Sequence, residues 1–175
     1  VEFDKKFVDL LKEKTDFDIY TFDELTETFS IEKFDYIHLG HVLEHLPDPT
    51  KTLQSLKKFA HSNTVFLIDG PLEQNFCLHR FYVDLGSKMK GKKYRNATPQ
   101  HLTLTTQKSQ LSFFKQAGLK TEQYIITEQY FPLPSKLEAS PGKIISFLIA
   151  SISIFLSKLM PTAGNIFHYR GKLNL

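Results

Sequence analysis

The segment from Phe34 to Pro49, FDYIHLGHVLEHLPDP, is the part of the chain richest in side chains that do chemistry. Within it, His41, Glu44 and His45 form an H-x-x-E-H pattern, which on a helix brings two imidazoles to one face to share a zinc ion. A metal-binding helix of this kind needs several turns and a third ligand. Two prolines follow within four residues of His45, and proline resists helix continuation. We therefore expect no bound metal and keep a zinc hydrolase only as a remote alternative.

The residues that precede the histidines predict how they are positioned. Tyr36–Leu39 is a mainly apolar run that closes in Gly40, which is typical of a buried strand entering a turn. His41 and His45 would then lie on the loop outside the carboxyl end of this strand. Open α/β sheets bind their ligands at that edge.

This segment resembles the fourth strand and following loop of class I S-adenosylmethionine-dependent methyltransferases, especially the bacterial small-molecule group with its FDxIxxxHVLEHLPDP stretch. The resemblance continues along the chain in the same order. Thr50–Phe59 is similar to the family's next helix and Thr64–Asp69 to its fifth strand. Gln100–Gly118 is similar to its H-x-x-x-(F/L)-T segment and a helix ending in Ala-Gly-Leu. The resemblance implies an α/β, Rossmann-like fold, with a mostly parallel sheet flanked by helices.

The resemblance also implies that the fold is incomplete at the N-terminus. The family's glycine-rich loop, which wraps the methionine part of the cofactor, has no counterpart here, since no G-x-G occurs in these residues. We expect the carboxyl-terminal portion of a methyltransferase, which as a fragment would bind the cofactor weakly or not at all and would be inactive. We expect one domain over residues 1–175, with acceptor-side insertions around 70–100 and 128–163.

The beginning of the chain resembles the strands that hold the nucleoside of S-adenosylmethionine in this family. Val1–Asp4 looks like the second strand, and Glu2 would accept hydrogen bonds from both ribose hydroxyls of the cofactor. Phe17–Tyr20 is expected to be the third strand, and Phe22 after it would lie near the adenine. The cofactor-binding residues that the resemblance implies are Glu2, Phe3, Phe22, Gly40 and His41.

Methyl transfer is an in-line displacement at a carbon activated by positive sulfur, so the protein mainly holds acceptor and methyl group in line. The acceptor must lose a proton, and histidine titrates in the right range to take it. We expect His45 to be the base and His41 to contact the cofactor or the acceptor. His79 and His101 are expected on the acceptor side. Each histidine could instead have only a structural role.

The segment 70–100 interleaves aromatic residues with lysines and arginines. Such a pattern could bind nucleic acid, attract an anionic acceptor such as a phosphorylated or nucleotide-linked sugar, or form a plain exposed loop. A net charge of +3 is too small to argue for a polyanion partner. We expect no nucleic-acid partner and a small-molecule acceptor: a sugar, a nucleotide-linked sugar or a lipid-like metabolite.

Ile144–Ser157 is a run of fourteen uncharged residues between Lys143 and Lys158. As a helix it would be about 21 Å long, shorter than the roughly 30 Å hydrocarbon core of a bilayer. One side carries small residues, at Ser146, Ala150, Ser153 and Ser157, and the other is broadly apolar. We expect that apolar side to pack on the protein's own core or in a homodimer. Membrane-surface or lipid contact is the alternative.

The single cysteine, Cys77, excludes an intrachain disulfide and favours a reducing compartment. The expected location is cytoplasmic, with a peripheral membrane association as a variant. A non-catalytic or membrane-associated binding module on the same fold stays open as the alternative to a methyltransferase.

Overall fold

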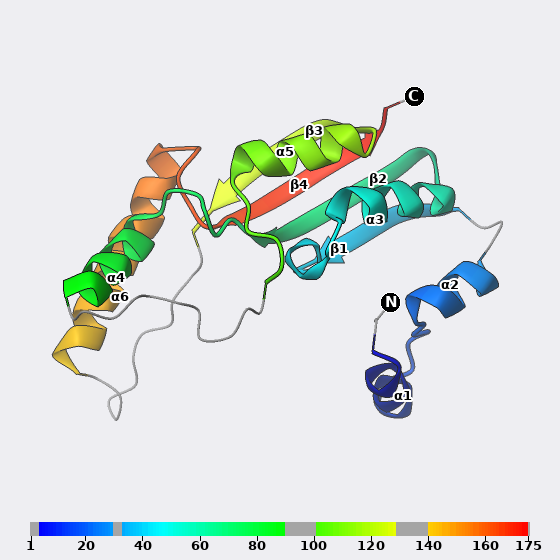
Figure 1. Ribbon diagram of the computed structural model, residues 1–175, viewed down its shortest axis with the longest axis horizontal. Coiled ribbons are helices and arrows are strands. Elements are labelled where there is room, and N and C mark those ends of the chain that lie inside the picture. The colour runs from blue at the N-terminus through cyan, green and yellow to red at the C-terminus, as the bar shows by residue number, and fades with distance from the viewer. Residues whose placement is uncertain (1–3, 30–32, 90–100, 129–139, 175) are drawn as a thin grey trace.

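A four-stranded mixed sheet forms the centre of the computed structural model, which describes residues 4–29, 33–89, 101–128 and 140–174 (Figure 1). The strands are β1 (Phe34–Gly40), β2 (Ala60–Pro71), β3 (Leu119–Thr127) and β4 (Ile166–Leu173). Their spatial order is β1-β2-β4-β3. The α/β fold is confirmed. Among these strands only β1 and β2 pair in parallel, because β4 runs antiparallel to both of its neighbours.

The parallel pair brings two carboxyl ends to one edge of the sheet. Gly40 at the end of β1 has its Cα partner in Asp69 near the end of β2. The loops that follow both strands therefore leave the sheet at the same place, as the sequence predicted for His41 and His45.

Two helices, α3 (Pro49–Leu56) and α5 (Gln107–Gln116), cover one face of the sheet (Figure 1). Phe114 of α5 is fully buried and stacks on Tyr169 of β4, with ring centroids 3.8 Å apart. Along β4, Phe167 and Tyr169 point into this core, whereas His168 and Arg170 alternate with them and are exposed. Strand β4 is thus apolar on the side of α3 and α5 and polar on the other.

A side-chain cap marks the start of each of these helices. The Asp48 carboxylate accepts a hydrogen bond from the Lys51 amide, and Pro49 is the first residue of α3. A 3₁₀ turn, η2 (Lys57–Phe59), continues α3 toward β2 and buries Phe59. Thr106 caps α5, and Gly118 follows its end with φ +77°.

The chain ahead of β1 differs from the prediction. It folds as two helices, α1 (Lys5–Lys14) and α2 (Phe22–Thr28), and the predicted strand Phe17–Tyr20 is wrong, because this stretch is irregular and Phe17 is 78% exposed. A parallel strand exists only beside a hydrogen-bonded partner, and no strand in the described ranges pairs with the outer edge of β1. The predicted strand Val1–Asp4 falls mostly on residues 1–3, outside the described ranges, and Asp4 itself caps α1.

The remaining helices, α4 (Leu78–Met89) and α6 (Pro141–Leu159), lie side by side beyond the carboxyl ends of β1 and β2 (Figure 1). We call this helix pair the α4–α6 lobe. The two helices meet through small and polar groups: His79 Nε2 lies 3.0 Å from Ser146 Oγ, and the His79 amide donates to Ser153 Oγ. Burial lowers the pKa of His79, so the imidazole is kept neutral in this contact.

A buried thiol ties the lobe to the end of β3. Cys77 Sγ donates a hydrogen bond to Glu128 Oε1 at 2.7 Å, and burial, followed by this hydrogen bond to a carboxylate, raises the pKa of Cys77 to about 11.

Because only the thiolate is nucleophilic, alkylation of Cys77 by iodoacetamide at pH 8 should be on the order of 100-fold slower than for an ordinary cysteine. The rate should keep rising with pH up to about 11 rather than levelling off near 9. The urea-unfolded protein is the control, and equal rates in folded and unfolded protein would contradict the prediction.

Candidate functional site

The loop after β1 is set by an unusual backbone conformation at His41. This residue has φ +52°, in the left-handed region, and its amide donates to the Asp69 carbonyl at 2.9 Å. A single 3₁₀ turn, η1 (Leu43–His45), follows. His41 therefore lies outside the only helical turn in this loop. The H-x-x-E-H zinc pattern requires two imidazoles on one face of an α-helix, and this loop has no α-helix that carries both His41 and His45.

Two carboxylates flank His41. Its Nδ1 lies 3.5 Å from Glu44 Oε1, and its Nε2 lies 3.8 Å from Asp69 Oδ2. The other Asp69 oxygen is 2.7 Å from His38 Nε2. Gly40 leaves room for this arrangement, since a Cβ there would lie 3.1 Å from the His38 ring. The carboxylates thus orient both imidazoles at the edge where β1 and β2 end.

A third loop joins the site through the backbone of Glu44. Its carbonyl accepts hydrogen bonds from the amides of Leu102 and Thr103, at 2.7 and 3.0 Å. These bonds place the His101 ring against the His45 ring, edge to face, with centroids 4.9 Å apart. The predicted residues His45 and His101 are therefore brought together by the tertiary structure.

Two acidic residues complete this cluster. Glu73, just beyond β2, holds His101 Nδ1 at 2.6 Å. Glu44 is 5% exposed, and its Oε1 is buried with no hydrogen-bond partner. A buried carboxylate oxygen in this state favours a proton-donating or cationic ligand. Ligand atoms of Glu44, His45 and His101 lie within 4.8 Å of one another, so the three could hold a divalent cation as well as an acceptor hydroxyl.

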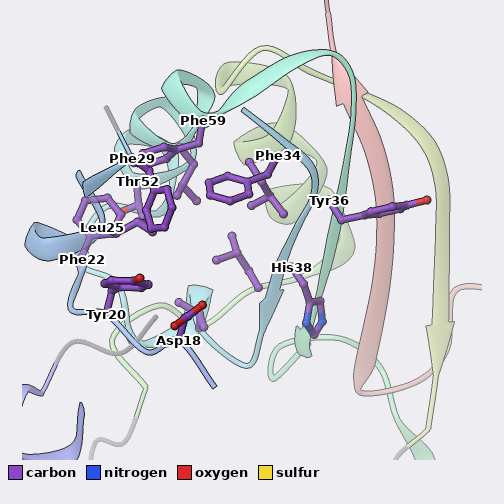
Figure 2. Close-up of a pocket in the computed structure, with 14 residues that line it drawn as sticks. Asp18, Tyr20, Phe22, Leu25, Phe29, Phe34, Tyr36, His38, Thr52 and Phe59 are labelled. Atoms are coloured by element: carbon purple, nitrogen blue, oxygen red, sulfur yellow. The ribbon is translucent and has the colours of Figure 1, made fainter. Parts of the chain in front are cut away.

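A cavity of about 510 Å³ lies along the outer edge of β1 (Figure 2). Five β1 residues contribute to its wall, and they are Phe34, Tyr36, Ile37, His38 and Leu39. Because successive side chains of a strand point to opposite faces, a wall of this kind is possible only along a strand edge. Helices α2 and α3 close its other sides. Figure 2 shows aromatic rings, one carboxylate and one imidazole around it, from Tyr20, Phe22, Phe29, Phe34, Phe59, Asp18 and His38.

The lining of this cavity fits the nucleoside half of a nucleotide-like cofactor. The rings of Tyr20 and Phe22 offer faces to an aromatic base, and the Asp18 carboxylate offers acceptors to sugar hydroxyls. His38, which lines the cavity, is paired with Asp69, and Asp69 also lies beside His41. These contacts connect the cavity wall to His41. The aminocarboxylate half would need a backbone cradle, and the sequence contains no G-x-G to build one.

The predicted site residues fall into three groups. Gly40, His41, His45 and His101 meet at the carboxyl edge of β1 and β2, and Phe22 lines the cavity beside it. His79 lies apart from this cluster, in the α4–α6 lobe against Ser146. Glu2 and Phe3 lie outside the described residues.

Sequence reasoning missed several contributors to this edge and to the cavity beside it. Asp69 and Glu73 had a usable signal, because acidic residues at the end of a predicted strand are candidates for the ligand edge of the sheet. Asp18 had none, because the segment around it was expected to be a strand.

Comparison with known protein families gives one match. The methyltransferase-domain family Methyltransf_23 matches residues 4–124, more than half of the chain. No curated protein sequence matches significantly.

Solved structures share the fold at low sequence identity. A SAM-dependent methyltransferase from Archaeoglobus fulgidus is 13% identical, with a TM-score of 0.56, over 98% of this chain and 73% of that one. A methyltransferase described as putative, from Haloferax volcanii and solved with its Trm112 activator, is 13% identical, with a TM-score of 0.57, over 99% and 70%. The plantazolicin methyltransferase BamL, solved with a triazolic desmethylPZN analogue and SAH, is 11% identical, with a TM-score of 0.50, over 99% and 66%.

Proposed function

Because this chain belongs to the class I S-adenosylmethionine-dependent methyltransferase family, we propose that it transfers a methyl group from S-adenosylmethionine to a small-molecule acceptor. The observation that carries the proposal is the meeting of three loops at one edge of the sheet, beside a cavity suited to a nucleoside. The acceptor classes that we propose are a sugar, a nucleotide-linked sugar or a lipid-like metabolite.

In this proposal the cofactor supplies a methyl carbon activated by a positively charged sulfur. The cavity residues Asp18, Tyr20 and Phe22 hold the nucleoside through ring contacts and a carboxylate. Glu2 and Phe3 are proposed to contact the same half of the cofactor. Gly40 and His41 would then border the reactive end.

His45 is the proposed general base, and the acceptor's proton would move to an imidazole nitrogen of this residue. Its ring is exposed on the loop and touches His101, which Glu73 orients. His41 is held between Glu44 and Asp69, so its role is to position the acceptor or the cofactor. The buried Glu44 Oε1 lies 3.5 Å from His41 Nδ1 but makes no hydrogen bond, so it could accept one from an acceptor hydroxyl.

Calorimetric titration of S-adenosylhomocysteine into the full-length protein tests cofactor binding. We expect saturable binding that weakens about tenfold or more in Phe22→Ala, because a base-stacking ring contributes about 1–3 kcal/mol. Glu2→Ala should weaken it by a similar factor through loss of the ribose hydrogen bonds.

The matched control is Phe17→Ala, which removes an equally large ring that is 78% exposed and does not line the cavity. Its affinity should equal that of the wild type. Absence of binding in the wild type, or equal affinities of the Phe22 and Phe17 variants, would refute the proposed site.

A further inference from the structure

Helix α6 packs with its small residues inward and its large apolar residues outward. Ala150, Ser153 and Ser157 are its buried residues. Only 17% of its most apolar stretch is buried, although the helix is long and apolar enough, by length and composition, to cross a membrane. The large side chains on its outer side are 46–64% exposed, and they are Ile144, Ile145, Leu148, Ile152, Phe155 and Leu159.

This arrangement is the reverse of that in a water-soluble protein. A helix on a soluble domain turns its large apolar stripe to the core and its small polar residues to water. Helices that contact lipid do the opposite, because small residues allow close helix packing and large apolar ones face the acyl chains. The prediction that the apolar side of 144–157 packs on the protein's own core is therefore wrong for its outermost residues. The serine side of α6 packs against the protein instead, through the contacts of Ser146 and Ser153 with His79 of α4.

Helix α4 adds a second exposed stripe. Phe81, Leu85 and Met89 recur at spacings of four and are 47–81% exposed. Because α4 and α6 lie side by side (Figure 1), both stripes belong to one lobe. We call the two stripes together the apolar surface of the lobe.

Positive charges border this surface. Lys143 and Lys158 stand near the two ends of α6, Lys88 stands near the end of α4, and all three are exposed. Helix α6 has no acidic residue, and Asp84 is the only one in α4. Each lysine near an anionic membrane surface contributes about 1 kcal/mol of attraction. A second copy docked by a two-fold axis would instead bring equal positive charges toward each other.

We infer that the α4–α6 lobe docks this protein on an anionic phospholipid bilayer, with α6 lying in the interface. The helix does not cross the bilayer, because α4 and β3 occupy its inner side. The lobe lies beyond the carboxyl ends of β1 and β2 (Figure 1), and the loops that carry His41, His45 and His101 meet at that same end of the sheet. Docking would therefore hold that edge close to the membrane, and if the proposed function holds, an acceptor carried in the bilayer could reach it.

Flotation of the full-length protein tests the inference, with vesicles of phosphatidylcholine alone and of phosphatidylcholine mixed with phosphatidylglycerol. We expect binding to the mixed vesicles, weaker at high salt. Phe155→Ser should weaken vesicle binding about tenfold, because it removes an aromatic side chain that would be buried in the apolar part of the membrane. Phe17→Ser is the matched control, since it makes the same change at an exposed ring outside the lobe.

Charge reversal provides a second pair of variants. Lys143→Glu with Lys158→Glu should abolish the preference for the anionic vesicles, whereas Lys108→Glu with Lys115→Glu on α5 should leave it unchanged. Circular dichroism confirms that each variant is folded.

Failure of the wild type to float, or equal effects of Phe155→Ser and Phe17→Ser, would overturn the inference. So would sedimentation that shows a dimer dependent on Phe155 without vesicle binding. These measurements contain no cofactor or acceptor, so their outcome is independent of the S-adenosylhomocysteine titration.

Discussion

His45→Ala is expected to lower the rate of methyl transfer by a factor of about 10²–10⁴ while leaving the affinity for S-adenosylhomocysteine unchanged. The imidazole lies on the loop at the carboxyl edge of β1 and β2, against His101. If it accepts the acceptor's proton, its loss slows the chemical step and not cofactor binding.

The measurement is transfer of a radiolabelled methyl group from S-adenosylmethionine into lipid and soluble metabolite extracts. Free imidazole should partly restore the His45→Ala rate, since it can take up the proton in the space vacated. His61→Ala is the matched control, because His61 lies at the start of β2, at the opposite end of the sheet, and pairs there with Asp35. Equal loss in both variants, or none in either, would contradict the proposed base.

A chelator separates this role from metal binding at the same residues. Glu44, His45 and His101 could hold a divalent cation, and a required ion would be removed by EDTA. With His45 as a base, the wild-type rate should be unaffected by EDTA. Loss of activity that returns on addition of zinc would assign His45 to a metal instead.

Phe114→Ala is expected to lower the free energy of unfolding by about 3–5 kcal/mol. The Phe114 ring is fully buried between α5 and the sheet, stacks on Tyr169 at 3.8 Å and lies 6.2 Å from Phe167. Its removal forfeits apolar burial and leaves a cavity that neighbouring rings, fixed in β4, cannot close.

Urea unfolding followed by circular dichroism measures this loss. Phe113→Ala is the matched control, because the adjacent ring on the same helix is only half-buried and should cost less than half as much. A loss at Phe114 no greater than at Phe113 would show that α5 does not anchor the sheet in this way.

Sequence signals that act over a few residues predicted much of the secondary structure around the site. The apolar run ending in Gly40 predicted a strand, and the structure confirms it. The Asp48–Pro49 start of α3 and the Thr106 cap of α5 likewise depend on residues within a few positions. The predicted strand at Phe17–Tyr20 is wrong because a strand depends on a partner that its own residues do not specify.

The sequence by itself determined the strand, the loop and the histidines of the candidate site, because backbone propensity and capping act over a few residues. Only the tertiary structure decided which side chains meet there. Glu73 and Asp69 reach His101, His41 and His38 because parallel pairing brings the ends of β1 and β2 together. The tertiary structure also decided which side of α6 is buried. Periodicity shows that a helix has two different sides, whereas the choice between them depends on what packs against it.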